Sequence, residues 1–147
     1  MKRLQIVTLS LLLLLGSVAQ AQLLAEVQTT AALALTLNPA VSLPPGSVRA
    51  VGPGAQDLID TVPGAETYTD WEVYTATGVT ARLQPAFVQQ VVTSFASSGY
   101  LLASQQEEQV GNQTRIRYSF ENTTGSSTLL YVIRTPNEFV WLVAEEE

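Results

Sequence analysis

Near the C-terminus, TLLYVIR at residues 128–134 is followed by TPNE and then by FVWLVA at residues 139–144. Both apolar segments have the length of β-strands and are rich in the β-branched and aromatic residues that favour strands. The four residues between them are typical of a hairpin connection. Each segment is apolar at odd and even positions alike, so we expect both strands to be covered on both faces.

Two further strands precede this hairpin. Residues 114–120 alternate cleanly, and one face of that strand carries Thr114, Ile116, Tyr118 and Phe120. Residues 100–109 begin with YLLA and lead into a turn at Gly111-Asn112. With the hairpin at 128–144, these strands predict a four-stranded antiparallel meander.

The strongest helical pattern precedes the meander. Pro85 suits a first helical turn, and Gly99 suits a C-terminal cap. Between them one apolar stripe is formed by Phe87, Val88, Val91, Val92 and Phe95. We expect this helix to cover the Ile116 face of the meander.

An earlier strand is predicted over residues 67–75, with Trp71 and Val73 on its buried face and Asp70, Glu72 and Tyr74 on the other. The fold class expected is therefore α+β. One main helix packs on a roughly four- to five-stranded antiparallel sheet, in the order β-α-β-β-β-β.

The N-terminus predicts export. Lys2 and Arg3 precede an apolar run over residues 4–15, and Ala19-Gln20-Ala21 forms a cleavage site, so residues 1–21 are expected to be a signal peptide cleaved after Ala21. The run of about 12 residues is shorter than the roughly 20 that a spanning helix needs. The expected location is periplasmic or secreted, with no stable membrane anchor after cleavage.

The section after the signal peptide, residues 22–65, is rich in Ala, Leu, Pro and Gly and is expected to be irregular. Alternation over residues 27–37 favours a strand, although the high helix propensity of alanine leaves a helix as the alternative. Residues 55–60 favour one helical turn. The domain organisation expected is thus signal peptide 1–21, irregular section 22–65 and α+β domain 66–147.

Composition narrows the chemistry. After signal cleavage five arginines and all thirteen acidic residues remain, a net charge of 5 − 13 = −8, which disfavours nucleic acid and membrane surfaces as partners. The chain has no histidine and no cysteine, and its sole lysine is Lys2. The usual general bases, zinc ligands and activated nucleophiles are therefore missing. We predict no enzyme activity, no catalytic residue, no cofactor and no metal site.

A candidate interaction surface is predicted from aromatic and arginine side chains: Trp71, Tyr74, Tyr131, Trp141, Arg115 and Arg117. The rings could stack on a sugar or peptide, or they could fill the core of the domain. The two arginines share a strand face and could grip an anionic ligand. The competing interpretation, which we favour, pairs them with Glu107, Glu108 or Glu121 on neighbouring strands.

Residues 62–144 also resemble a known group. The turn VPGAE at 62–66, the strand over 71–74, the helix over 87–95 and the following Gly99-Tyr100 resemble small uncharacterised exported bacterial proteins. In that group a P-G-A turn, a strand, a helix ending in Gly-aromatic and an antiparallel meander follow one another. The resemblance implies the fold alone, because the group has no assigned catalytic residues.

Three functions stay open. The first is a non-catalytic binding or interaction domain with a protein or small-molecule partner in the cell envelope or medium. The second is an inhibitor-type module acting on a secreted enzyme, which requires the hairpin loops at Gly111 and Asn137 to project together. The third is a carboxylate-only hydrolase, which requires two facing acids. Its candidates are Asp57, Asp60, Asp70, Glu72 and Glu121.

Overall fold

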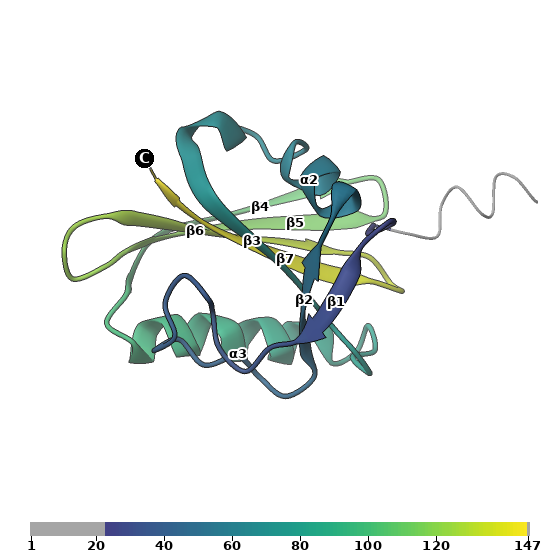
Figure 1. Cartoon of the computed structure of the whole chain (residues 1–147), viewed down its shortest axis with the longest axis horizontal. Coiled ribbons are helices and arrows are strands. Elements are labelled where there is room, and N and C mark those ends of the chain that lie inside the picture. The colour runs from purple at the N-terminus through teal and green to yellow at the C-terminus, as the bar shows by residue number, and fades with distance from the viewer. Residues whose placement is uncertain (1–22, 147) are drawn as a thin grey trace, which may run out of the picture.

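The centre of the molecule is a seven-stranded antiparallel sheet in the order β1-β2-β3-β7-β6-β5-β4 (Figure 1). The computed structural model describes residues 23–146, so the predicted signal peptide lies outside the described residues. The strands are β1 (Gln28–Ala31), β2 (Ser47–Val51), β3 (Tyr68–Ala76), β4 (Leu101–Val110), β5 (Gln113–Glu121), β6 (Ser127–Arg134) and β7 (Phe139–Glu146). The helices are α2 (Pro53–Ile59), the short 3-10 turn η1 (Ala65–Thr67) and α3 (Gln84–Ser97).

The predicted fold class is wrong in its number of elements, although the antiparallel meander β4-β5-β6-β7 is confirmed. Over residues 23–146 there are seven strands and two α-helices, not four or five strands and one main helix. The additional strands, β1 and β2, have only four and five residues and lie in the Pro/Gly-rich section. Strand β1 falls within residues 27–37, where alternation favours a strand, whereas β2 is not expected from the sequence because five residues give too few periods for alternation to be detected. Within the described residues, no helix is long and apolar enough to cross a bilayer.

Both faces of the sheet are covered, as the apolar pattern of β6 and β7 predicts. Figure 1 shows α3 across one face, and α2 with its connecting loops across the other. From β7, Trp141 packs in the core on the α3 side, while Val140 and Leu142 pack in the core on the α2 side. A strand that is buried on both of its faces is expected to be apolar at odd and even positions alike.

Helix α3 covers the face that the sequence predicts. Its Phe87, Val91 and Phe95 share one core with Ile116 and Phe120 of β5. The rings of Phe95 and Phe120 stack with centroids 4.8 Å apart. Aromatic pairs of this kind add about 0.5–1.5 kcal/mol to the hydrophobic burial itself.

The section from residue 23 to residue 65 closes both cores. Leu35, Val41 and Leu43, from the connection between β1 and β2, are buried on the α3 side. Leu58 and Ile59 of α2 are buried on the α2 side, where residues 23–27 pack over them. These residues belong to the same sheet and the same cores as the α+β part of the chain.

The closest backbone approach in this section involves Gly54 at the start of α2. A Cβ atom at residue 54 would lie 1.5 Å from the carbonyl oxygen of Ala25. The N-terminal segment can therefore cross α2 only where the helix has no side chain.

Gly54→Ala should destabilise the protein although alanine is the better helix former. The helix-propensity gain is about 1 kcal/mol, whereas forcing backbone apart in a packed region costs typically about 1–3 kcal/mol or more. We expect a net loss of unfolding free energy, measured by urea denaturation. The exposed Gln56→Ala in the same helix serves as the control and should change stability by less than about 0.5 kcal/mol. Equal stability of the two variants would contradict the packing described.

Candidate functional site

The sheet divides the six residues of the predicted interaction surface. Tyr74 and Trp141 lie on the α3 side, stacked with ring centroids 5.7 Å apart, and their exposed fractions are 0 % and 1 %. These two rings therefore belong to the core and not to a surface. Trp71 is half-buried on the α2 side and makes an edge contact with Tyr68 at 6.0 Å.

Tyr74 belongs to a buried polar cluster that the sequence does not reveal. Its hydroxyl donates to the carboxylate of Glu72, which is also buried. The same carboxylate oxygen accepts from the backbone N–H of Thr36 at 3.0 Å, and Arg49 donates to the Thr36 hydroxyl at 2.9 Å. The expectation that Glu72 and Tyr74 face outward fails because the β1–β2 connection covers that face of β3.

Burial and the hydrogen bond to Glu72 raise the pKa of the Tyr74 hydroxyl well above its ordinary value. Burial also raises the pKa of Tyr118, with Glu107 adding to the effect. Both hydroxyls therefore stay neutral in the folded protein at a pH where tyrosines of the unfolded chain, with pKa near 10, already ionise.

The free energy of unfolding should accordingly fall as the pH rises above about 10, because the unfolded state then releases protons that the folded state keeps. Each such tyrosine contributes a slope of up to about 1.4 kcal/mol per pH unit. Tyr74→Phe should make this slope shallower in denaturant titrations between pH 8 and 11. Tyr68→Phe, the same chemical change on a half-buried ring, is the control. An unchanged slope in Tyr74→Phe would contradict the assignment.

The remaining predicted residues, Arg115, Arg117 and Tyr131, come together on the α2 side. They line a pocket of about 250 Å³. We call it the Arg115 pocket, and its walls are Pro63, Gln106, Glu107, Glu108, Arg115, Arg117 and Tyr131. Pairing of β4 with β5 places Glu108 opposite Arg115 and Gln106 opposite Arg117, and pairing of β5 with β6 places Tyr131 beside Arg117.

Arg117 is held firmly in this pocket. Its guanidinium lies 5.7 Å from the ring centroid of Tyr68 and 5.9 Å from that of Tyr131, close enough for cation–π attraction. Its Nη1 donates to the carbonyl oxygen of Pro63 at 2.9 Å. Arg117 thereby ties the loop between α2 and η1 to the sheet.

Arg115 has a looser set of partners. Its Nε and Nη2 both donate to the side-chain oxygen of Gln113, at 3.2 and 2.9 Å, and its Nη1 reaches the carbonyl of Thr61 at 3.5 Å. The favoured pairing of the two arginines with glutamates is thus replaced by bonds to neutral oxygens. Glu108 still stands opposite Arg115 in the strand register.

The pocket offers hydrogen-bond donors from the arginines and acceptors from Glu108, with an amide of Gln106 that can serve as either. Tyr131 is only 4 % exposed, so it offers a ligand little ring surface for stacking. The arrangement can hold a small polar ligand and orient it. The sequence did not point to Pro63 or Gln106 as pocket residues. The two-residue turn at Gly111-Asn112 was the signal that could have placed Gln106 opposite Arg117.

Glu72, one of the candidate hydrolase acids, lies on the opposite side of the sheet from Asp57 and Asp60. Glu72 is buried on the α3 side with Tyr74, whereas Asp57 and Asp60 are exposed on and after α2. Asp60 accepts a bond from Gln56 at 3.1 Å. Within residues 23–146, no group of three or more His, Cys, Asp or Glu side chains is placed to hold a metal ion.

No protein-family model, curated protein or solved structure matches the chain. The interpretation of the Arg115 pocket therefore depends on its geometry.

Proposed function

We propose that the protein is a non-catalytic binding domain whose ligand, a small molecule with a carboxylate and a hydroxyl or ammonium group, occupies the Arg115 pocket. One observation carries this proposal. The Nε–Nη2 edge of Arg115 already holds a single oxygen with two hydrogen bonds, from Gln113 at 3.2 and 2.9 Å. A carboxylate takes this edge in a bidentate pair that is stronger than the bond to a neutral amide.

The rest of the pocket supports a ligand of mixed polarity. Glu108, opposite Arg115, would repel a purely anionic ligand but accept a bond from a hydroxyl or ammonium group. The volume of about 250 Å³ is equivalent to roughly eight water molecules at about 30 Å³ each. That volume suits a ligand of the size of a sugar acid or an amino acid.

Binding of glucuronate, with glucose as the uncharged reference, tests the proposal. We expect chemical-shift changes at pocket residues in a two-dimensional NMR titration with glucuronate and none with glucose. Arg115→Ala should weaken binding by about tenfold or more, since a hydrogen bond to a charged group contributes about 1.5–3 kcal/mol.

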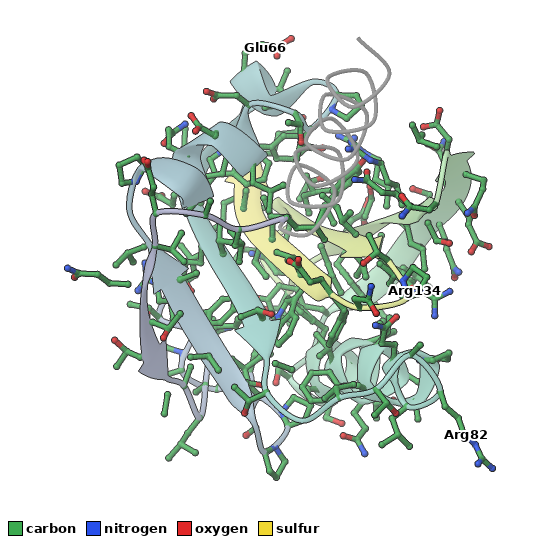
Figure 2. All side chains as sticks on the ribbon, turned by 90° about the vertical axis from the view of Figure 1, so that its right-hand side faces the viewer. Glu66, Arg82 and Arg134 are labelled. Carbon is green, nitrogen blue, oxygen red and sulfur yellow. The ribbon has the colours of Figure 1, made fainter. Side chains whose placement is uncertain are left out.

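Arg82→Ala is the matched control. It removes the same charge from the turn before α3, where the Arg82 side chain points away from the body of the protein (Figure 2). Glucuronate binding that is lost equally in both variants would show only a general charge effect. Absence of glucuronate and amino-acid binding in the native protein would overturn the proposed ligand class.

An inhibitor-type module acting on a secreted enzyme is a second candidate, and the strand register favours it. Thr114 pairs with Arg134, which in turn pairs with Phe139. The β4–β5 turn at residues 111–112 and the β6–β7 turn at residues 135–138 therefore lie at one end of the sheet, on the right in Figure 1. Two adjacent loops are the arrangement that the inhibitor hypothesis requires.

This second candidate predicts inhibition of a secreted hydrolase in a panel that covers serine, cysteine and metal-dependent enzymes. The double variant Asn112→Arg with Asn137→Arg should relieve that inhibition, because both side chains are exposed at the two turns. Thr123→Arg, in the exposed β5–β6 turn at the opposite end, should leave it intact. If no enzyme in the panel is inhibited, the second candidate is abandoned.

A further inference from the structure

Strand β4 is an open edge of the sheet. It is last in the strand order, and all ten of its residues are exposed. Long exposed edges invite pairing with another strand, and proteins oppose this with charged side chains, proline, β-bulges or a short length. Over residues 101–110 the sequence LLASQQEEQV is long and has neither lysine nor proline. Its protective features are Glu107, Glu108 and a register shift between Leu102 and Ser104, and they restrict the register of a pair without shortening the open edge.

The charges of β4 exclude two of the ways in which it could pair with itself. In an antiparallel pair, two residues that lie directly opposite each other either both point their N–H and C=O groups at the partner strand or both point them away from it. When the two strands are identical and related by a two-fold axis, one residue therefore lies opposite its own copy, and we call it the centre of the pair. Centres at Glu107 or Glu108 would oppose two identical carboxylates, which is destabilising. A centre at Gln106 sets Glu107 opposite Gln105 and Glu108 opposite Ser104, with an amide facing an amide at the centre.

The ends of the strand fit the same register. Pairing of β4 with β5 shifts between Leu102 and Ser104, so Ala103 has no partner on β5. If the same residue is skipped in a β4–β4 pair, Leu101 of one copy faces Val110 of the other. These apolar side chains are 71 % and 45 % exposed in the single chain. Their contact would remove apolar surface from water at both ends of the pair.

We propose that two copies of this chain associate through β4, antiparallel and centred on Gln106, to form one continuous sheet across a two-fold axis. Each β4 then has a hydrogen-bonded neighbour on both sides. In a symmetric dimer the same surface of each subunit usually contacts its copy across a two-fold axis.

The pairing would also change the surroundings of the Arg115 pocket. Gln106 and Glu108 line that pocket, and in this register they face Gln106 and Ser104 of the second copy. The two pockets would lie side by side across the axis on the α2 side of the joined sheet. The second strand would thus add a wall to each pocket.

The association should be weak and salt-dependent. Contact along one strand edge belongs to the small class of interfaces, which are typical of transient complexes. The whole chain carries a formal net charge of −6, so two copies repel one another and added salt screens that repulsion. We expect the dimer fraction to rise with protein concentration and with salt.

Sedimentation velocity of the ligand-free protein, over a wide concentration range and at low and high salt, tests the proposal. The decisive variant is Gln106→Glu, which would place two carboxylates opposite each other at the centre of the pair. In the single chain the new carboxylate would stand opposite Arg117, so the monomer should keep its stability. We expect at least a tenfold weakening of dimerisation.

Gln90→Glu is the matched control, with the same change of charge on the exposed face of α3, and its dimer should be as strong as that of the native chain. Leu101→Ser should weaken the dimer less than Gln106→Glu does. A native chain that stays monomeric at all concentrations and salt levels would overturn the proposal. So would a dimer that Gln106→Glu leaves unchanged, or that Gln106→Glu and Gln90→Glu weaken equally. Because no ligand is present, these results are independent of the proposed ligand.

Discussion

The burial of β6 and β7 on both faces is the constraint on which the rest of the structure depends. Two adjacent strands without a polar face cannot form the outer layer of a small domain, so each side of the sheet needs its own cover. Helix α3 supplies one cover, and α2 with residues 23–27 supplies the other. The N-terminal section is therefore part of the fold because two apolar surfaces must leave water.

The elements that the sequence predicts are those with long patterns. Residues 84–97 and β5 repeat their apolar positions over two periods or more, and β6 and β7 are continuously apolar. These elements and β4 appear within a few residues of their expected bounds. Strands β1 and β2 are too short for a pattern of that length, and their place depends on backbone pairing, of β1 with β2 and of β2 with β3. Short edge-side strands of this kind are fixed by tertiary context.

The candidate site shows the same division. Arg115 and Arg117 could be recognised because they alternate with apolar residues on one strand. The two-residue turn before that strand fixes which residues of β4 lie opposite them. Pro63 could not be found, because it reaches the pocket from a loop whose position depends on the whole sheet. Tyr74 was misplaced on a surface for a related reason, since the β1–β2 connection that covers it has no sequence signal of its own. Trp141, which was placed on the same surface, is covered by Phe87 of α3.

The grip on Arg117 has a consequence for the thermodynamics of the proposed binding. A long side chain normally loses rotational freedom when a ligand fixes it, at a cost of about 0.5–1.5 kcal/mol. Arg117 has lost that freedom already, between two tyrosine rings and the carbonyl of Pro63. The Nε and Nη2 atoms of Arg115 already donate to the side-chain oxygen of Gln113. A ligand that binds there would replace that oxygen with one of its own. The entropy of arranging both cations is therefore lost when the chain folds, and a ligand would meet a site that is preorganised.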